Sequence, residues 1–321
     1  MRYVQEVNRA LPQVTVLGVP SSAGAHHAGQ DLAPAALRSH GFVDRLVAAG
    51  VDVRDLGDLA GEIFAVDHAH PAQRNLAAVV RVAHTVADRV EHARRTGAIV
   101  IVLGGDCTIT LGVLAGIQRI DSTAGLLYFD GDADLNAPVQ TRSGILDATG
   151  IAHVLGIADT ELGHLDGKSP MLEDDHLVML GYDETDPDSF NAKVFEQRPS
   201  LRRFADHVLR ADPTGTAHQA LNALSAAAGS IVVHFDVDAV NSGDLPLANF
   251  PHYGTGVDLT VAARVLSILC SAPNLAAIVL TEVNPTHDPG GTHLDRYVDA
   301  VTGAISTGLT THRLTPHPDS R

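Results

Sequence analysis

The chain has 321 residues, 45% of them hydrophobic and 19% charged, which is the composition of an ordinary globular protein. It carries 22 Lys and Arg against 38 Asp and Glu, a net charge of −16. Nucleic acids and anionic membranes attract basic surfaces, so this charge argues against both as partners. With two cysteines and no apolar signal-peptide core near the N-terminus, we expect a cytoplasmic protein without a disulfide framework.

Apolar β-type runs alternate with helical patterns along most of the chain. This alternation predicts a mostly parallel sheet with helices on both faces. We therefore expect one three-layer α/β/α domain over residues 1–321, with an eight-stranded sheet. The predicted strands are Thr15–Val19, Val51–Leu56, Ala98–Leu103, Gly125–Phe129, His176–Leu180, a weak one near His207–Leu209, Ile231–Phe235 and Leu275–Val283. The predicted helices are Pro34–Ala48, Pro71–Arg95, Thr108–Arg119, Ala148–Ile157, Thr216–Ala228, Thr260–Ser271 and Leu294–Thr307.

Two runs of alternating aspartates follow two of these strands directly. Residues at i, i+2 and i+4 of an extended segment point to one side, and ligands of parallel sheets bind at the carboxyl ends of the strands. We therefore expect the five carboxylates to converge, and a cation is the simplest way to hold so many like charges together. These residues are Asp130, Asp132, Asp134, Asp236 and Asp238.

Two further strand ends carry reactive side chains. Cys107 follows the strand Ala98–Leu103 through a Gly-Gly turn, and Glu282 comes at the end of the last strand. Two interpretations of Cys107 are open. It is a nucleophile if the helix that begins at Thr108 lowers its thiol pKa, or it is a weak metal ligand or no ligand at all.

Six short segments, in this order along nearly the whole chain, resemble the motifs of the ureohydrolase family, which includes arginase, agmatinase and formiminoglutamase. The counterparts in the family are Gly-Pro-x-x-Leu-Arg, Gly-Gly-Asp-His-Ser, Phe-Asp-Ala-His-x-Asp, Ser-Gly-x-x-His, Asp-Val-Asp and Glu-Val-Asn-Pro. The segments in this chain are Gly29–Arg38, Gly104–Ile109, Phe129–Asp134, Ser143–Asp147, Phe235–Asp238 and Glu282–Pro285.

The resemblance implies an enzyme with two Mn²⁺ ions, bridged by a hydroxide that attacks a guanidinium or amidine carbon. By the family pattern, Asp130 and Asp236 bridge both ions. Asp134 completes one metal site and orients the hydroxide, while Asp238 completes the other. The resemblance also implies a homo-oligomer, a trimer or a hexamer.

The family pattern also assigns the substrate contacts. Glu282 is expected to hold the guanidinium group by charge-assisted hydrogen bonds. Asn136 and Ser143 are expected near the polar head of the substrate, and Asp186 near its amino group. The partner implied is a small cationic guanidino compound.

The chain departs from this pattern at every motif histidine. Cys107 and Asp132 stand where the two ions expect imidazole, and Asp147 stands where the family keeps its acid–base histidine. Asp132 makes the second site wholly oxygen-ligated, which suits Mn²⁺, Mg²⁺ or Ca²⁺. Asp147 either shuttles protons or caps the helix that follows it. Ile145 replaces an asparagine that helps to hold an α-carboxylate.

Other histidines are candidates to replace the lost ligands. His234 lies one step deeper on the strand face of Asp236, so we expect it to be a buried, hydrogen-bonded imidazole. The remaining candidates, each equally well explained as an ordinary loop or helix residue, are His26, His27, His153, His252, His287 and His293.

Two functions of different class follow. The first is a divergent metal-dependent hydrolase of C–N bonds in a small guanidino or amidino compound, other than arginine itself because Asn is lost at Ile145. The second is a catalytically degenerate protein of the same fold that binds a ligand or a partner subunit. Loss of the three motif histidines favours the second function. Retention of residues expected to face the substrate favours the first, namely Asn136, Ser143, Asp186 and Glu282.

Overall fold

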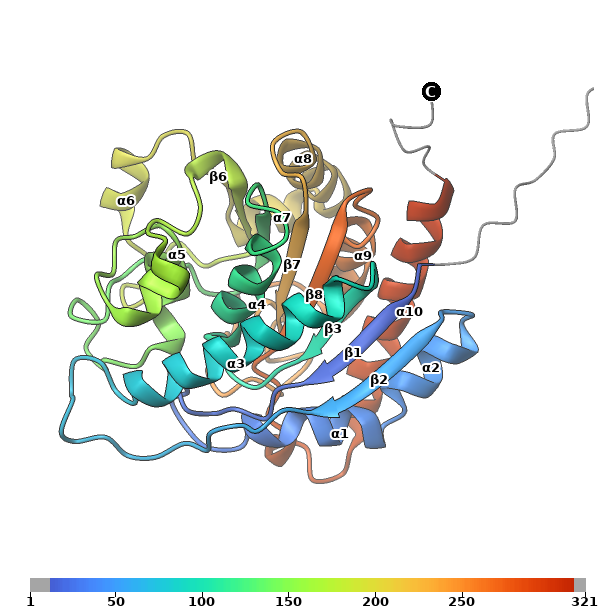
Figure 1. Cartoon of the computed structure of the whole chain (residues 1–321), viewed down its shortest axis with the longest axis horizontal. Helices are drawn as coiled ribbons and strands as arrows, with labels where there is room; N and C mark the ends of the chain where they lie inside the picture. The colour runs from blue at the N-terminus through green and yellow to red at the C-terminus, as the bar shows by residue number, and fades with distance from the viewer. Residues whose placement is uncertain (1–11, 315–321) are drawn as a thin grey trace, which may run out of the picture.

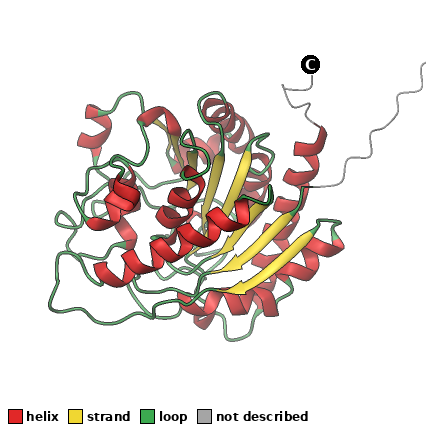
Figure 2. Cartoon of the chain, in the orientation of Figure 1, coloured by secondary structure: helices red, strands yellow, loops and turns green. Residues whose placement is uncertain are grey.

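The computed structural model describes residues 12–314, so the ends of the predicted domain, 1–11 and 315–321, lie outside the described residues. Its centre is an eight-stranded sheet in the order β2-β1-β3-β8-β7-β4-β5-β6, in which every neighbouring pair is parallel (Figures 1 and 2). The predicted parallel α/β fold is confirmed. The strands are β1 Val14–Gly18, β2 Val53–Asp58, β3 Ile99–Leu103, β4 Gly125–Phe129, β5 Leu177–Leu180, β6 Arg202–Phe204, β7 Ile231–Asp236 and β8 Leu275–Thr281.

Helices cover both faces of this sheet. Among the described residues, no helix is both long and apolar enough to cross a membrane. Two hydrophobic clusters form the core: one packs α1, α2, α8, α9 and α10 on one face of the sheet, and the other packs α3, α4 and α5 on the other. The α-helices are α1 Ala33–Ser39, α2 Phe42–Ala48, α3 Leu76–Arg94, α4 Ile109–Gln118, α5 Gly150–Val154, α6 Ala192–Gln197, α7 Asp206–Ala211, α8 Pro213–Ser225, α9 Leu259–Leu269 and α10 Thr292–Leu314.

The central strands are apolar on both faces because both faces are covered. In β3, Ile99, Ile101 and Leu103 join the first cluster, whereas Val100 and Val102 join the second. The same alternation places Tyr128 of β4 on the α4 face of the sheet. His234 of β7, its partner in the parallel register, follows on that face.

Four neighbouring strands, β3, β8, β7 and β4, stand at the centre of the sheet. Because they are parallel, their carboxyl ends meet at one edge. The loops after these ends carry Cys107, Glu282, Asp236 and Asp130. Residues from distant parts of the chain therefore meet at a single place.

Three predicted elements are corrected by the structure. The weak strand near His207–Leu209 is wrong, because these residues lie in α7 and the edge strand is Arg202–Phe204. A short apolar run fits strand and helix equally well, so periodicity alone does not decide between them. The predicted helix Pro34–Ala48 is two helices separated at Gly41, which has a left-handed φ of 83°. The predicted helix Pro71–Arg95 begins only at Leu76.

Candidate metal centre

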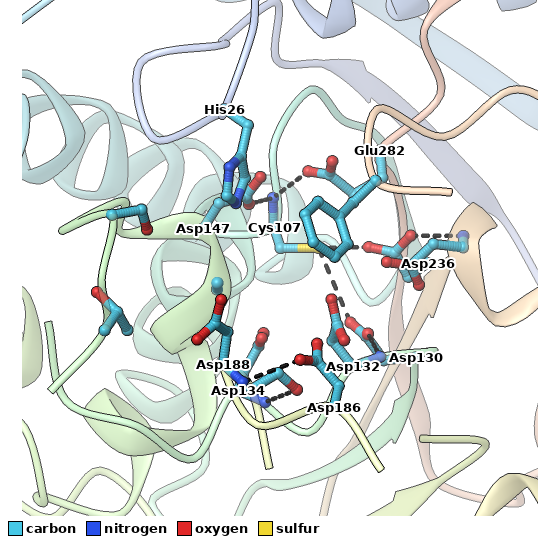
Figure 3. Close-up of a pocket in the computed structure, with 16 residues that line it drawn as sticks. His26, Cys107, Asp130, Asp132, Asp134, Asp147, Asp186, Asp188, Asp236 and Glu282 are labelled. Atoms are coloured by element: carbon cyan, nitrogen blue, oxygen red, sulfur yellow. Dashed lines mark hydrogen bonds between the residues drawn. The ribbon is translucent and has the colours of Figure 1, made fainter. Parts of the chain in front are cut away.

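A small cavity of about 80 Å³ lies at the carboxyl edge of the four central strands (Figure 3). Ten of the eleven residues predicted for the site line it, which brings the predicted cluster together. These ten residues are Cys107, Asp130, Asp132, Asp134, Ser143, Asp147, Asp186, Asp236, Asp238 and Glu282. The carboxylates come from three strand ends and two loops, as the parallel topology requires.

The turn between β3 and α4 packs against the loop that follows β1. This contact fixes the position of Cys107. A Cβ atom on Gly105 would lie 1.7 Å from the Ser21 carbonyl oxygen, so only glycine fits there. The Asp106 carboxylate accepts hydrogen bonds from the backbone N–H groups of Gly24 and Thr108, each at 3.1 Å. Cys107 is therefore fixed at the start of α4, facing the cavity.

Two acidic residues of the cavity adopt the left-handed backbone conformation that favours glycine. Asp134 has φ 52° and Glu282 has φ 65°. Such conformations cost of order 1–3 kcal/mol each and concentrate at functional sites. The backbone is thus bent so that both side chains turn toward the cavity.

One group of ligand-type atoms, which we call site A, consists of Cys107, Asp130, His234 and Asp236. Cys107 Sγ lies 2.6 Å from Asp236 Oδ2, 3.9 Å from Asp130 Oδ2 and 3.7 Å from His234 Nε2. His234 Nε2 is 3.2 Å from Asp130 Oδ2. All four residues are buried. Site A thus offers one sulfur, one imidazole nitrogen and two carboxylates.

A second group, site B, consists of Asp132, Asp238 and His252. His252 Nε2 lies 3.5 Å from Asp132 Oδ1 and 3.9 Å from Asp238 Oδ2. His252 Nε2 and Asp132 Oδ1 are buried without a hydrogen-bond partner among the described residues. Buried polar atoms normally have partners, so a divalent cation between them fits this donor set.

A third contact joins Asp147 and Glu282 through the backbone of Cys107. The Cys107 N–H donates to Asp147 Oδ1 at 2.7 Å and to Glu282 Oε1 at 3.1 Å, as Figure 3 shows. The Gln30 side-chain amide also donates to Glu282. Asp147 makes no capping hydrogen bond to α5, whose N-cap residue is Thr149. The Asp147 carboxyl therefore faces the cavity instead of capping a helix.

Burial and mutual repulsion oppose ionisation of most acids in the cavity. Burial, then the charge of Asp132, raises the pKa of Asp130 to about 7. Burial, reinforced by neighbouring carboxylates, also raises the pKa values of Asp134, Asp147, Asp236, Asp238 and Glu282 well above the ordinary range. The exception is Asp132: burial raises its pKa, but the His252 imidazole outweighs burial and leaves it lowered.

The same forces act on the thiol of Cys107. Burial, then the charges of Asp236 and Glu282, raises the pKa of Cys107 well above its ordinary value. A thiol held in this way donates a hydrogen bond to Asp236 and stays protonated at neutral pH. The structure therefore disfavours Cys107 as a free nucleophile.

Comparison with known proteins identifies the family. The family model described as the arginase family matches residues 12–302. The chain belongs to the arginase family. Arginase from Bacillus caldovelox is 27% identical over 280 residues, covering 86% of this chain and 92% of that protein. The structure of Bacillus subtilis arginase matches with a TM-score of 0.79 at 25% identity, covering 91% of this chain and 98% of that chain.

The fold is also shared with a solved structure of lower sequence identity. The agmatine ureohydrolase of Thermoplasma volcanium matches with a TM-score of 0.66 at 17% identity, covering 96% of this chain and 94% of that chain. At this identity the match shows the shared fold alone. The resemblance expected from the six motifs is confirmed by the family model, the relatives and the fold.

Three residues expected to contact substrate lie in different surroundings. Ser143 and Asp186 line the cavity. Asn136 does not, because its amide donates to the Asp188 carbonyl at 2.8 Å and accepts from Asn191 at 3.0 Å. A role for Asn136 in binding substrate stays a prediction.

Four residues that shape the site were not among the eleven predicted site residues, although His26 was a candidate replacement for a lost ligand. Tyr128 donates a 2.6 Å hydrogen bond to Asp134 Oδ2, and Thr110 Oγ1 lies 2.7 Å from His234 Nδ1. Phe250 and His26, whose rings are 5.2 Å apart, line the cavity. Among these four, the sequence offered a signal only for His26, a histidine in a loop at the carboxyl edge of the sheet.

The candidate histidines differ in whether they belong to sites A and B or line the cavity. His234 and His252 join sites A and B, and His26 lines the cavity. His153 is buried outside the cavity, with Nδ1 2.8 Å from the Thr149 carbonyl oxygen. His27, His287 and His293 belong neither to the two sites nor to the cavity lining.

Proposed function

We propose that this member of the arginase family is a metal-dependent hydrolase that cleaves a C–N bond in a small guanidino or amidino compound. The observation that carries the proposal is the convergence of five buried aspartates from two strand ends on one cavity, together with Glu282. Membership of the arginase family supports the same reaction class.

The proposed metal ligands are Asp130, Asp132, Asp134, Asp236 and Asp238, with Cys107 as an additional ligand. Carboxylate oxygens suit hard divalent cations, and Mn²⁺ is the cation that the family resemblance favours for the oxygen-rich part of the site. Divalent cations, when bound there, supply an activated water nucleophile near neutral pH. They also offset repulsion between the buried carboxylates.

Glu282 is the proposed partner of the cationic end of the substrate. A guanidinium donates parallel hydrogen bonds to a carboxylate, and such charge-assisted bonds are strong where water is excluded. Gln30 and the Cys107 N–H already donate to Glu282 in the structure. The substrate is therefore expected to compete with the Gln30 side chain and to leave the backbone contact in place.

Asp147 is the proposed proton donor. The leaving amine needs a proton as the C–N bond breaks, and a carboxyl group provides one at neutral pH only if its pKa is raised. Burial, then the nearby Asp106 carboxylate, raises the pKa of Asp147. Its carboxyl also faces the same cavity as Glu282. Asp147 thus replaces the acid–base histidine of the family in our proposal.

The substrate class is a small cation other than arginine. The acidic cavity favours positive charge, and its small volume favours a short molecule. Ile145, which is 4% exposed, offers no hydrogen bond to an α-carboxylate. A decarboxylated or modified guanidine fits this lining better than an α-amino acid.

The test is a urea-release assay over a panel of guanidino and amidino compounds. Metal-depleted protein is assayed before and after addition of Mn²⁺, alongside the Asp236→Asn variant. Metal-dependent turnover of one compound, lost in Asp236→Asn, supports the proposal. Saturable binding of a compound without turnover under any divalent cation would instead support the degenerate ligand-binding protein and contradict the hydrolase.

A further inference from the structure

We propose that His234 and His252, two histidines outside the family motifs, are metal ligands that replace the missing motif histidines. Site A then binds a cation with affinity for sulfur, such as Zn²⁺ or Co²⁺, through Cys107 and His234. Site B binds a harder cation through Asp132, Asp238 and His252. This inference rests on the proposed metal-dependent function and assigns its ligands and the class of metal.

Two of the spacings between ligand atoms at site A are close to those around one tetrahedral ion, whereas the Cys107–Asp130 and His234–Asp236 spacings, 3.9 and 4.0 Å, are wider. Zinc lies about 2.3 Å from thiolate sulfur and about 2.0–2.1 Å from imidazole nitrogen, so neighbouring ligands of a tetrahedral ion are about 3.3–3.6 Å apart. The sulfur–nitrogen distance from Cys107 to His234 is 3.7 Å. The nitrogen–oxygen distance from His234 to Asp130 is 3.2 Å. Cys107 and Asp236, at 2.6 Å, lie closer because the thiol donates a hydrogen bond to that carboxylate.

His234 is held with one nitrogen directed at the site. Its Nδ1 lies 2.7 Å from the Thr110 hydroxyl on α4, and its ring stacks on Tyr128 at a centroid distance of 4.2 Å. If Nδ1–H donates to Thr110, the lone pair of the neutral ring lies on Nε2, which faces Cys107 and Asp130. Ligand histidines are oriented by this kind of contact through their second nitrogen.

Asp134, which the family pattern expects to complete one metal site, lies outside both ligand groups of this structure. The Asp134 carboxylate accepts the hydrogen bond of Tyr128 instead. In this assignment the His234 imidazole takes the place of Asp134 in the ligand set of the proposed hydrolase and supplies the fourth donor atom of site A.

An independent observation at site B points to a ligand, namely two buried polar atoms without hydrogen-bond partners in the described part of the chain. His252 is 7% exposed, yet its Nε2 has no hydrogen-bond partner among the described residues, and neither has Asp132 Oδ1, 3.5 Å away. The backbone of His252 is fixed by two hydrogen bonds with Ser242, at 2.8 and 3.0 Å. The His252 imidazole is thus fixed in position with Nε2 near the carboxylates of Asp132 and Asp238, as expected for a metal ligand.

The two donor sets favour different metals. Thiolate favours Zn²⁺, Co²⁺ or Fe²⁺ over Mn²⁺, whereas two carboxylates and one imidazole accept Mn²⁺. Binding at site A breaks the S–H bond of Cys107 and forms a sulfur–metal bond, and the proton leaves to solvent. No oxidation is involved.

The experiment is a Co²⁺ titration of metal-depleted protein, followed by absorption spectroscopy. We expect a near-ultraviolet sulfur-to-cobalt charge-transfer band that saturates with the first equivalent. Cys107→Ser should lose the band, and the matched variant of the other buried cysteine, Cys270→Ser, should keep it. Loss of a group that only orients a ligand typically lowers metal affinity by 10–100-fold. Because we propose His234 as a direct ligand, His234→Gln should lower the affinity for the first equivalent of Co²⁺ by at least about 100-fold.

His252→Gln should lower the affinity for the second equivalent of Co²⁺ to a similar extent and leave the charge-transfer band unchanged. His153→Gln, which replaces a buried histidine outside both sites, is the control for folding and should bind like the wild type. X-ray absorption of the wild-type cobalt protein gives a readout without any variant, because one sulfur per site A ion should be present in the first coordination sphere.

Cobalt binding without the band, without sulfur in the first sphere and with wild-type affinity in both histidine variants would overturn the assignment. The proposed hydrolase is judged separately by the urea-release assay with Mn²⁺. A protein that turns over substrate but shows no sulfur ligation refutes the ligand assignment alone, whereas sulfur ligation without turnover of any compound refutes the hydrolase alone.

Discussion

Tyr128 and His234 stack with ring centroids 4.2 Å apart and an angle of 14° between their planes. They meet because β4 and β7 pair these two residues in register. The hydroxyl of Tyr128 donates to Asp134, so one side chain supports a histidine of site A through its ring and an aspartate of the cavity through its oxygen.

The Tyr128→Phe variant separates these two roles. The phenyl ring keeps the stacking on His234, whereas Asp134 loses its hydrogen bond. We expect kcat to fall by about 10-fold or more while the affinity of site A for Co²⁺ stays unchanged, because positioning groups act on the reacting geometry. Steady-state kinetics and a cobalt titration of the same preparation measure both. A weakened site A with unchanged kcat would show that the hydroxyl acts on the metal instead.

The Glu282→Gln variant tests whether Glu282 binds the cationic end of the substrate. The amide keeps the shape but loses the charge, so kcat/KM should fall by at least about 100-fold, as is typical when a single preorganised electrostatic contact is removed. Metal content should not change. Glu196→Gln on the exposed face of α6 is the matched control and should behave as wild type. Equal activity of the Glu282→Gln variant and the wild type would rule out this role.

Stability of the metal-depleted protein should fall as pH rises through neutrality. The folded-state pKa of Asp130 is raised to about 7, chiefly by burial and then by the charge of Asp132. A raised pKa gives stability that is present below the ordinary value and is lost as pH rises through the folded value. Asp134, Asp147, Asp236, Asp238 and Glu282, whose pKa values are also raised, act in the same direction. Asp132, whose pKa is lowered, acts in the opposite direction and offsets part of the decline. His252, with its pKa raised to about 10, also adds stability that declines above neutrality.

Thermal unfolding from about pH 5 to pH 8 measures this dependence. We expect Tm of the metal-depleted protein to fall over this range, and saturating Mn²⁺ or Zn²⁺ to flatten the decline. The Asp130→Asn variant should flatten it without metal. A Tm that rises with pH in the metal-depleted wild type would contradict the electrostatic account of the cavity.

The hydrophobic cluster that packs α1, α2, α8, α9 and α10 against the sheet gives a prediction about stability and not about activity. Phe42 of α2 is fully buried, and truncation of such a ring leaves a cavity, so Phe42→Ala should cost about 3–5 kcal/mol of the free energy of unfolding. Val47 lies on the same helix and is 53% exposed, so Val47→Ala should stay within about 0.5 kcal/mol of wild type. Chemical denaturation of both variants makes the comparison.

The aspartates of the site could be predicted because their position follows from the strand that precedes each of them. An apolar run such as Ile231–Phe235 marks a buried strand, and the residue after it must lie at the carboxyl edge. The same logic gave the parallel sheet. It failed at His207–Leu209, where a few apolar residues favour neither helix nor strand.

The histidine contacts could not be predicted from the sequence. The direction of the His234 nitrogen depends on Thr110, which is 124 positions earlier and reaches it only through the packing of α4 on the sheet. His252 approaches Asp132 because a loop is tied to Ser242. Loop paths follow tertiary contacts, which periodicity does not encode. The single domain over residues 1–321 and the trimer or hexamer remain predictions.

The central claim is that the aspartate cluster is a metal centre, and the most direct measurement is elemental analysis of protein purified without a metal-affinity tag. The wild type should hold one or two equivalents of Mn²⁺, Zn²⁺ or Fe²⁺, and Asp236→Asn should hold far less while remaining folded, since the change removes a buried charge. A wild-type protein that is metal-free, and that stays metal-free after incubation with Mn²⁺ and Zn²⁺ near pH 8, would contradict the account.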